Sequence, residues 1–308
     1  MEASITFKSV AKKINEETLL ADLSFGVEKN TRFAIVGPNA SGKSTIIKLL
    51  SGILQKDKGS IYVKGYDISI KSNKIKSIVG YMSQVSDFSN DINIYDNLSI
   101  YAQLFGSTKE QASIRIEELA QLLDFKDYLS SYSMNLSYGI QRVLMFAKSI
   151  IHNPEILLLD EPTANIDPVY KELIWNCISD YLSDKTVLFT TNNFEDAQCF
   201  SHRIAILYNG NIRYNGTFDY LVENTHGLVK FTISYKEKIP EQLIKSISLN
   251  PKILKHKIID NTIRFYSTDK SEYFKLLKFS LDCDINDIDI SKCTLEDIFK
   301  GINVKGIE

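Results

Sequence analysis

Residues 37–44 have the types and spacing of a phosphate-binding loop. They fit the pattern G-x-x-x-x-G-K-[ST] and read Gly37, Pro38, Asn39, Ala40, Ser41, Gly42, Lys43 and Ser44. An apolar run precedes them, and a run with helical spacing that begins at Thr45 follows. The motif requires this strand–loop–helix context. A Gly-rich turn without a ligand is therefore the weaker interpretation.

The chemistry that such a loop performs is phosphate binding. Its two glycines let successive backbone N–H groups point inward, and the dipole of the following helix adds positive potential at the same place. Lys43 is expected to reach the terminal phosphates of a nucleotide, and Ser44 is expected to ligate Mg²⁺. The loop thus predicts a site for a nucleotide and its metal ion.

Two acids at the end of an apolar strand are the second candidate site. Residues 156–160 form the strand, Asp160 ends it, and Glu161 follows. Ligands bind at the carboxyl ends of strands in open α/β sheets. Asp160 suits the outer shell of Mg²⁺, and Glu161 suits the polarisation of an attacking water. Alone, such acids are more often solvated loop residues, so the interpretation depends on the phosphate loop.

The elements that must position these residues follow an alternating pattern. Apolar runs rich in β-branched residues predict strands, and the runs between them have helical spacing. Strands that are apolar throughout, with helices between them, indicate a largely parallel sheet covered on both faces. The strands are expected at residues 32–36, 78–83, 156–160, 186–190 and 203–207, and two amphipathic helices at residues 140–151 and 169–181.

The composition of the chain changes after residue 226. The remainder is rich in Lys and Ile and predicts the order strand, helix, strand, strand, helix, strand, which is that of a ferredoxin-like module. A final helix is opened by Thr294. We therefore expect two domains, residues 1–225 and residues 226–308. The second holds no catalytic constellation and is expected to be regulatory or dimer-stabilising.

Composition excludes several other classes of protein. The 308 residues carry 36 Lys and Arg against 38 Asp and Glu, so the chain has no global basic field for nucleic acid. No stretch approaches the roughly 20 apolar residues of a membrane span, and the N-terminus lacks a signal-peptide core. We expect a cytoplasmic chain, soluble or peripheral on the cytoplasmic face of a membrane. The four cysteines lack metal-ligand spacing and are expected to be reduced and buried.

The motifs together resemble the ATP-binding subunits of ABC transporters. Besides the phosphate loop and residues 158–162, the matching segments in order are Gln84, residues 136–139 and residues 165–168. Residues 88–106 and 295–299 look like the exporter branch that includes drug-, sodium- and haem-pathway ATPases. The resemblance covers residues 5–223 well. It implies a P-loop NTPase of ABC type, with antiparallel N-terminal strands and a helical subdomain at about residues 86–150, followed by a small α+β ferredoxin-like domain.

The resemblance also implies roles for single residues. The cofactors would be ATP and Mg²⁺. Gln84 would join Ser44 and Asp160 near the metal and sense the membrane partner. The three residues directly before the helix expected from residue 140 are Ser137, Tyr138 and Gly139. They would face the γ-phosphate of ATP held by a second subunit, and Asp167 would contact that subunit. For Ser137 and Asp167, a plain helix-cap role is the alternative.

Three departures from the family pattern bear on hydrolysis. Ile14 stands where relatives place an aromatic ring under adenine, so base stacking is reduced to aliphatic contact. One residue separates Gly139 from Gln141, where relatives usually carry two. Asn192 stands where relatives carry a His that helps hold the γ-phosphate, and Asn cannot become cationic. The sequence therefore predicts a slow ATPase, with Glu161, Asn192 and Gln84 as the catalytic residues.

Three functions fit these observations. The leading one is a transporter motor in which two such subunits close on two ATP molecules and drive substrate, by analogy outward, through a separate membrane permease. A second is a weakly hydrolysing regulatory subunit paired with an active ATPase, which Asn192 favours and Glu161 opposes. A third is a soluble ABC ATPase of translation or DNA repair. The expected partners are the permease and a second ATP-binding subunit, identical or related, and no nucleic acid.

Overall fold

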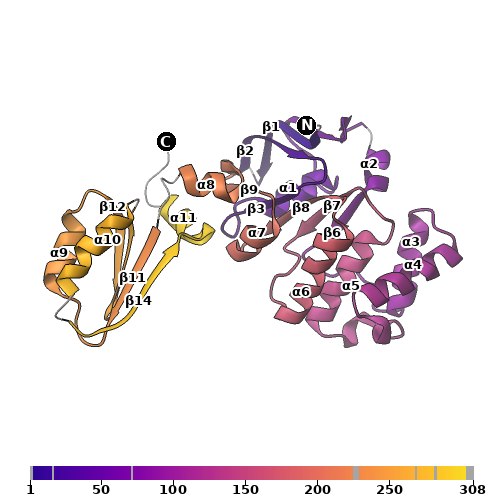
Figure 1. The fold of residues 1–308 in the computed structure, drawn as a ribbon. Coiled ribbons are helices and arrows are strands. Elements are labelled where there is room, and N and C mark those ends of the chain that lie inside the picture. The colour runs from indigo at the N-terminus through magenta and orange to yellow at the C-terminus, as the bar shows by residue number, and fades with distance from the viewer. Residues whose placement is uncertain are drawn as a thin grey trace. The chain divides into compact units, whose positions relative to one another are not determined.

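The computed structural model describes residues 3–15, 17–70, 72–224, 229–267, 269–280 and 283–302. The chain divides into two compact units, residues 1–216 and residues 217–308 (Figure 1). The predicted boundary between residues 225 and 226 falls outside the described residues.

A six-stranded sheet forms the centre of the first unit. Five of its strands run parallel, and β10 pairs antiparallel with β9 at one edge, in the order β10-β9-β3-β8-β7-β6. Every residue of β7 and β8 is buried, as expected for strands covered on both faces. The predicted strands are confirmed as β3 (Arg32–Val36), β6 (Val79–Met82), β7 (Ile156–Asp160), β8 (Thr186–Thr191) and β9 (Arg203–Tyr208), with β10 at Asn211–Gly216.

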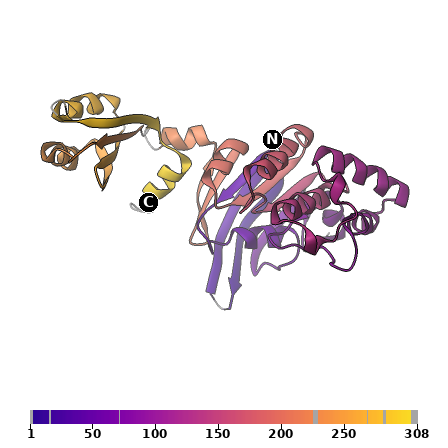
Figure 2. The same ribbon diagram turned by 90° about the horizontal axis from the view of Figure 1, so that it is seen from below.

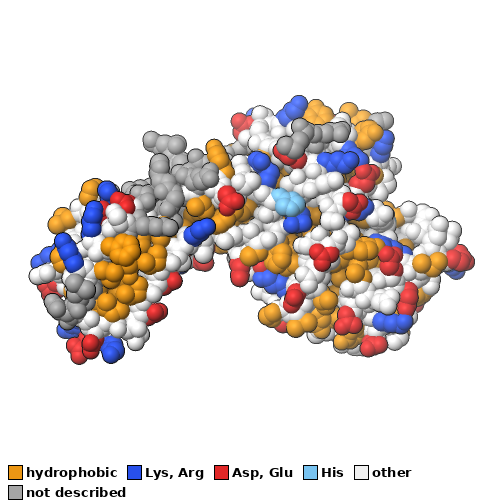
Figure 3. Space-filling view, in the orientation of Figure 1, with side chains coloured by type: hydrophobic (Ala, Val, Ile, Leu, Met, Phe, Trp, Pro, Cys, Tyr) orange, Lys and Arg blue, Asp and Glu red, His pale blue; other side chains and the backbone are white. Residues whose placement is uncertain are grey.

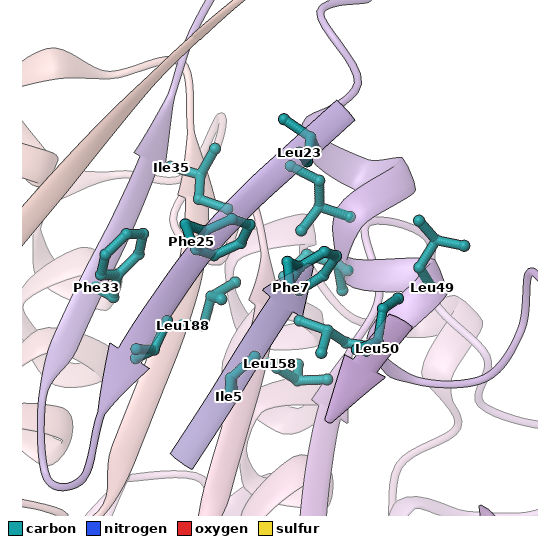
Figure 4. Close-up of a cluster of buried hydrophobic side chains, with 14 of the residues drawn as sticks. Ile5, Phe7, Leu23, Phe25, Phe33, Ile35, Leu49, Leu50, Leu158 and Leu188 are labelled. Carbon is teal, nitrogen blue, oxygen red and sulfur yellow. The ribbon is translucent and has the colours of Figure 1, made fainter. Parts of the chain in front are cut away.

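A second, antiparallel sheet packs near the phosphate loop. Its order is β2-β1-β4-β5. Figure 4 shows side chains from this sheet, from the central sheet and from the first helix gathered in one apolar cluster. The rings of Phe7 and Phe25 stack at 4.5 Å between centroids, and those of Phe25 and Phe33 at 5.7 Å. The strands are β1 (Ala3–Ile14), β2 (Glu17–Glu28), β4 (Lys58–Val63) and β5 (Tyr66–Asp67).

Helices connect the strands of the central sheet. Figures 1 and 2 both show α3 and α4 side by side, within the segment predicted to be a helical subdomain. The predicted helix at residues 169–181 changes at Cys177, where the chain continues as a π-helical turn to Tyr181. The helices are α1 (Lys43–Leu50), α2 (Ser72–Ile78), α3 (Ile94–Leu104), α4 (Lys109–Leu122), α5 (Tyr138–Ile150), α6 (Pro168–Asn176) and α7 (Phe194–Phe200).

The second unit has its own sheet and its own core. Its strands are all antiparallel, in the order β12-β13-β11-β14, and every second residue of β11 is buried. Phe231 of β11 stacks on Phe265 and on Tyr273, each at 5.1 Å between centroids. The unit begins with α8 (Phe218–Asn224), which was not predicted. The predicted order of elements is confirmed by β11 (Val229–Tyr235), α9 (Glu241–Leu249), β12 (Ile253–Ile259), β13 (Thr262–Ser267), α10 (Lys270–Leu277), β14 (Ile285–Lys292) and α11 (Leu295–Ile302).

On the face that Figure 3 shows, acidic and basic side chains are interspersed, and hydrophobic side chains gather on the second unit.

All four cysteines are free, but the prediction that all are buried is wrong. Cys177 and Cys293 are buried, Cys283 is half-buried and Cys199 is exposed. Cys199 lies on the outer side of the short helix α7, where the apolar pattern covers only part of the helix.

Candidate nucleotide-binding site

The phosphate loop runs from the end of β3 to the start of α1, and its glycines are required by close packing. A side chain at Gly37 would place a Cβ 2.2 Å from the carbonyl oxygen of Leu207. Gly42 has φ of +104°, and a Cβ there would lie 2.6 Å from Leu20 Cδ2. Residues with side chains rarely adopt that conformation. The loop backbone therefore packs directly against β2 and β9.

Lys43 is buried inside this loop. Its Nζ donates hydrogen bonds to the carbonyl oxygens of Gly37 (2.8 Å) and Pro38 (3.1 Å). It also lies 3.7 Å from Glu161 Oε1, and both side chains are less than a tenth exposed. Burial lowers the pKa of Lys43, while the nearby carboxylates raise it. Ser41 Oγ is buried and has no hydrogen-bond partner in the described part of the chain.

Ser44 and Asp160 are in direct contact. The Ser44 hydroxyl donates to Asp160 Oδ1 at 3.0 Å, and the Thr190 hydroxyl donates to the same oxygen at 2.6 Å. Asp160 is 1% exposed. The structure thus brings together two oxygen donors that the sequence places 116 residues apart. Oxygen donors of this kind suit Mg²⁺.

Glu161 is held in an unusual backbone conformation. Its φ is +50°, in the left-handed region that non-glycine residues seldom adopt and that is enriched at functional sites. The backbone N–H of Glu161 donates to Thr190 Oγ1 (3.1 Å), and its Oε2 accepts from the backbone N–H of Asn192 (3.1 Å). Burial raises the pKa of Glu161, although Lys43 opposes this shift. A carboxylate with a raised pKa is a better proton acceptor.

Lys43, Ser44 and Glu161 line one cavity of about 510 Å³. Ligand sites are typically clefts of about 300–1,000 Å³. Gln84, Glu161 and Asn192 line the cavity from three different strand ends, beside the phosphate loop. From β2, Leu19 lines it, whereas Ile14 lies at the end of β1, is 42% exposed and is not part of the lining. The contact of Ile14 with a base stays a prediction.

Residues 137–139 lie apart from the cavity of their own chain. Ser137 caps α5, its Oγ accepting from the N–H of Ile140 at 3.5 Å, and Tyr138 is 47% exposed. A Cβ at Gly139 would lie 2.3 Å from the ring of Tyr170 on α6. Asp167 likewise caps α6, through the N–H of Tyr170 at 3.5 Å. The helix-cap role that was the alternative for Ser137 and Asp167 is therefore present, and their roles toward a second subunit stay predictions.

Arg142 is a residue of this region that the sequence analysis missed. It is 1% exposed and donates to the carbonyl oxygens of Ser83 (3.0 Å), Gln84 (2.9 Å) and Glu161 (2.6 Å). Arg142 thus fastens α5 to the two loops that carry Gln84 and Glu161. A charged residue within the apolar stripe of α5 was the available signal, because arginine is seldom fully buried without partners.

No described histidine lines the cavity, so none of them supplies the cationic group that Asn192 lacks. His202 Nδ1 accepts from the backbone N–H of Arg32 at 3.2 Å and is not part of the cavity lining. The ring of His152 stacks on Phe105 at 3.9 Å between centroids. No group of three or more His, Cys, Asp or Glu residues that could hold a metal ion occurs among the residues that the structure describes.

Comparisons with known proteins agree with this geometry. The family model described as ABC transporter matches residues 20–164. The Nod factor export ATP-binding protein I of Burkholderia thailandensis is 30% identical over 226 residues, which are 73% of this chain and 74% of that protein. A solved ATP-binding subunit of an ABC transporter superposes with a TM-score of 0.67 at 21% identity, over 72% of this chain and 92% of that chain. A dimeric ATP-binding cassette bound to ADP and Pi gives a TM-score of 0.63 at 21% identity, over 69% and 98%.

The fold and the site define an ABC-type P-loop ATPase. The chain belongs to the ABC transporter family, as an ATP-binding subunit that hydrolyses ATP and works with a membrane permease. The predictions of family, of fold class and of this function are confirmed. No helix in the part of the chain that the structure describes is long and apolar enough to cross a membrane.

Proposed function

We propose that this chain is the motor subunit of an exporter. It closes on two ATP molecules together with a second copy or a related ATP-binding subunit, and closure drives a permease carried on another chain. The observation that carries the proposal is one cavity that Lys43, Ser44 and Glu161 line, with Asp160 hydrogen-bonded to Ser44. The name of the Burkholderia relative, an export ATP-binding protein, supports outward transport. The subunit then lies on the cytoplasmic face of the membrane.

Phosphate binding falls to the loop of residues 37–45. Backbone N–H groups at the start of α1 and the Lys43 ammonium attract the terminal phosphates of ATP. Lys43 now donates to carbonyl oxygens of its own loop, so its hydrogen bonds are exchanged for phosphate oxygens when ATP enters. The unpartnered hydroxyl of Ser41 is a further donor within the loop. Ile14, at the end of β1, is assigned to the adenine by aliphatic contact.

The residues around Asp160 fit a magnesium ion. Ser44 and Asp160 offer oxygens 3.0 Å apart, and Gln84, which lines the cavity with Ser44, carries an amide oxygen. All are hard oxygen donors, which Mg²⁺ prefers. Bound there, the ion neutralises negative charge on the phosphate oxygens. Gln84 also lies on the loop that Arg142 fastens, so its position is tied to that of α5.

Glu161 is assigned as the group that accepts a proton from the attacking water. It is held beside Lys43 and keeps its orientation through the backbone N–H of Asn192. The Asn192 side chain supplies a neutral donor at most. The chain therefore turns over ATP slowly by itself. This observation also favours the second candidate function, a weakly hydrolysing regulatory subunit paired with an active ATPase.

The second subunit supplies what each cavity lacks. Ser137, Tyr138 and Gly139 are outside the lining of their own cavity, and Tyr138 is about half exposed. A serine hydroxyl and free N–H groups at the N-terminus of α5 suit an anion. These three residues, with Asp167, are assigned to the ATP held by the partner.

An apolar groove is assigned to the permease. It has a volume of about 190 Å³ and includes residues of α3, in the segment that resembles the permease-facing part of exporter ATPases. Ile53, 58% exposed, stands at its rim. Ile53→Asp should weaken co-purification with the permease and leave ATP affinity unchanged; unaltered co-purification would remove this assignment. The groove is lined by Leu50, Ser51, Ile53, Ile75, Lys76, Val79, Tyr81, Tyr101 and Phe105.

The decisive experiment is the loss of Lys43. Lys43→Ala should abolish ATP binding measured by calorimetry, because it removes the only cation that the described residues place inside the cavity. Lys64→Ala is the matched control, since Lys64 pairs with Glu155 outside the cavity. Unchanged affinity in Lys43→Ala would overturn the assignment of the site.

A further inference from the structure

Asp196 is a buried carboxylate that the roles assigned above do not use. It lies in the first turn of α7 and is 2% exposed. Its Oδ2 accepts a hydrogen bond from the Thr163 hydroxyl at 2.8 Å, and its Oδ1 forms an ion pair with the ammonium of Lys171. A buried charge is costly unless it is paired. The carboxylate and its two partners are therefore held as one unit.

The two partners flank one short loop. Thr163 directly precedes residues 164–167, and Lys171 follows them by one turn of α6. Asn165 in this loop lines the cavity and has φ of +58°, and Asp167 at its end caps α6. Asp196 thus holds both ends of the loop that is assigned to the contact with the second subunit.

The start of α7 ties Asp196 to the other wall of the cavity. Asn193 caps this helix, its Oδ1 accepting from the N–H groups of Glu195 (2.9 Å) and Asp196 (3.2 Å). The preceding residue, Asn192, donates its N–H to Glu161 Oε2. Two hydrogen bonds and the peptide link between Asn192 and Asn193 therefore join Asp196 to Glu161, the carboxylate assigned to water activation.

We propose that Asp196 is a positioning residue that keeps the loop of residues 164–167 in register with Glu161 and Asn192. The surface offered to the second subunit is then formed before closure, and closure does not have to order it. This inference rests on the proposed function, because closure with a second subunit is the step that the surface serves. A residue that only packs α6 against α7 would affect stability and leave the chemistry of the folded protein unchanged.

The test uses Asp196→Asn in the full chain, since this change keeps the shape and one acceptor oxygen and removes the charge. We expect ATP affinity, measured by calorimetry, to stay within about twofold, and kcat to fall at least about tenfold with little change in KM. ATP-driven dimerisation, measured by sedimentation, should weaken with kcat. Lys171→Gln should have the same effect, whereas Lys171→Arg, which keeps the ion pair, should retain the kcat of the wild-type chain.

The double variant separates positioning from packing. Because Asp196 and Lys171 act through one pair, Asp196→Asn with Lys171→Gln should cost no more than either change alone. Lys64→Met, at the ion pair with Glu155, is the matched control and should leave all readouts unaltered. If Asp196→Asn does not fold, Thr163→Val gives the same comparison with a smaller change.

Three results would overturn the inference: an unchanged kcat in folded Asp196→Asn, additive losses in the double variant, or a loss of ATP affinity parallel to the loss of turnover. A different result would overturn the proposed function: wild-type protein that does not bind ATP and does not dimerise when ATP is present. If the wild-type protein binds and hydrolyses ATP and the Asp196→Asn variant does both equally well, only the role of Asp196 is overturned.

Discussion

At the scale of single residues, the most informative contact is the one that the backbone of Asn192 makes with Glu161. Asn192 holds Glu161 through its backbone N–H, at 3.1 Å from Oε2. Any residue type except proline at position 192 can make this bond. The side chain at 192 therefore remains available for the phosphate, and its chemistry can be changed without releasing Glu161.

Asn192→His is predicted to raise ATP turnover. A γ-phosphate contact that strengthens in the transition state is typically worth about 10²–10³ in rate. We expect kcat to rise at least about tenfold and ATP affinity to change much less. Steady-state hydrolysis and calorimetry on the purified chain measure both. Vigorous turnover by the wild-type chain, with no gain in Asn192→His, would mean that another group already makes this contact.

The pH dependence of turnover should report the burial of Glu161. Burial raises its pKa above the usual range of glutamate. Below that pKa Glu161 is protonated and cannot accept a proton, so kcat should fall as pH decreases, at a higher pH than for an exposed glutamate, about 4.3. Glu161→Gln should abolish this limb of the profile. Glu195→Gln, at an exposed acid of α7, should leave it in place.

At the scale of elements, α5 and α6 meet at a contact that admits no side chain. A Cβ on Gly139 would lie 2.3 Å from the ring of Tyr170. This contact fixes the helix whose N-terminus carries Ser137, and α5 also carries Arg142 to the loops of Gln84 and Glu161. The packing of the two helices therefore positions both the residues assigned to the partner's ATP and those of the chain's own cavity.

Gly139→Ala is predicted to lower the free energy of unfolding by about 1–3 kcal/mol, the usual cost of overpacking. Denaturation with urea measures this change. The loss should shrink in a Tyr170→Ala background, where the ring is absent. An equal loss in both backgrounds would show that the ring is not the obstacle.

At the scale of the whole molecule, ATP is expected to join two copies of the chain. Residues 137–139 do not line their own cavity, and we expect them to complete the site of a second subunit. Glu161→Gln removes the proton acceptor and keeps the phosphate contacts. Dimers of this variant should accumulate with ATP on size-exclusion chromatography and disappear when Lys43→Ala is added. Monomers alone at high protein and ATP concentrations would count against a role of Ser137 and Gly139 across an interface.

Removal of the second unit beyond α8 should leave ATP binding intact and change assembly. A chain that ends after Asn224 should bind ATP normally, because the described lining of the cavity lies between residues 19 and 192. The second unit has a separate core around Phe231 and Phe265, and we expect its loss to weaken the ATP-driven dimer or to change the coupling to the permease. Dimerisation, hydrolysis and coupling that all stay unaltered would indicate a passive appendage.

The sequence by itself determined the phosphate loop, the acids that end β7, five strands of the central sheet and the order of the elements from β11 to α11. These features depend on local spacing. A glycine-rich loop must lie between a strand and a helix, and apolar periodicity decides which face of an element is buried. The strands β3 and β7 accordingly match their predicted bounds.

Only the tertiary structure decided which distant residues meet around the cavity. Arg142 donates to carbonyl oxygens 58 and 19 residues away, and Asp196 binds Thr163 across 33 residues. A backbone carbonyl exists at every position, so no residue type marks the partner of a buried arginine. The exposure of Cys199 and the contact of Gly139 with Tyr170 likewise depend on how helices pack. Such contacts arise when elements pack together, and no local pattern in the chain encodes that packing.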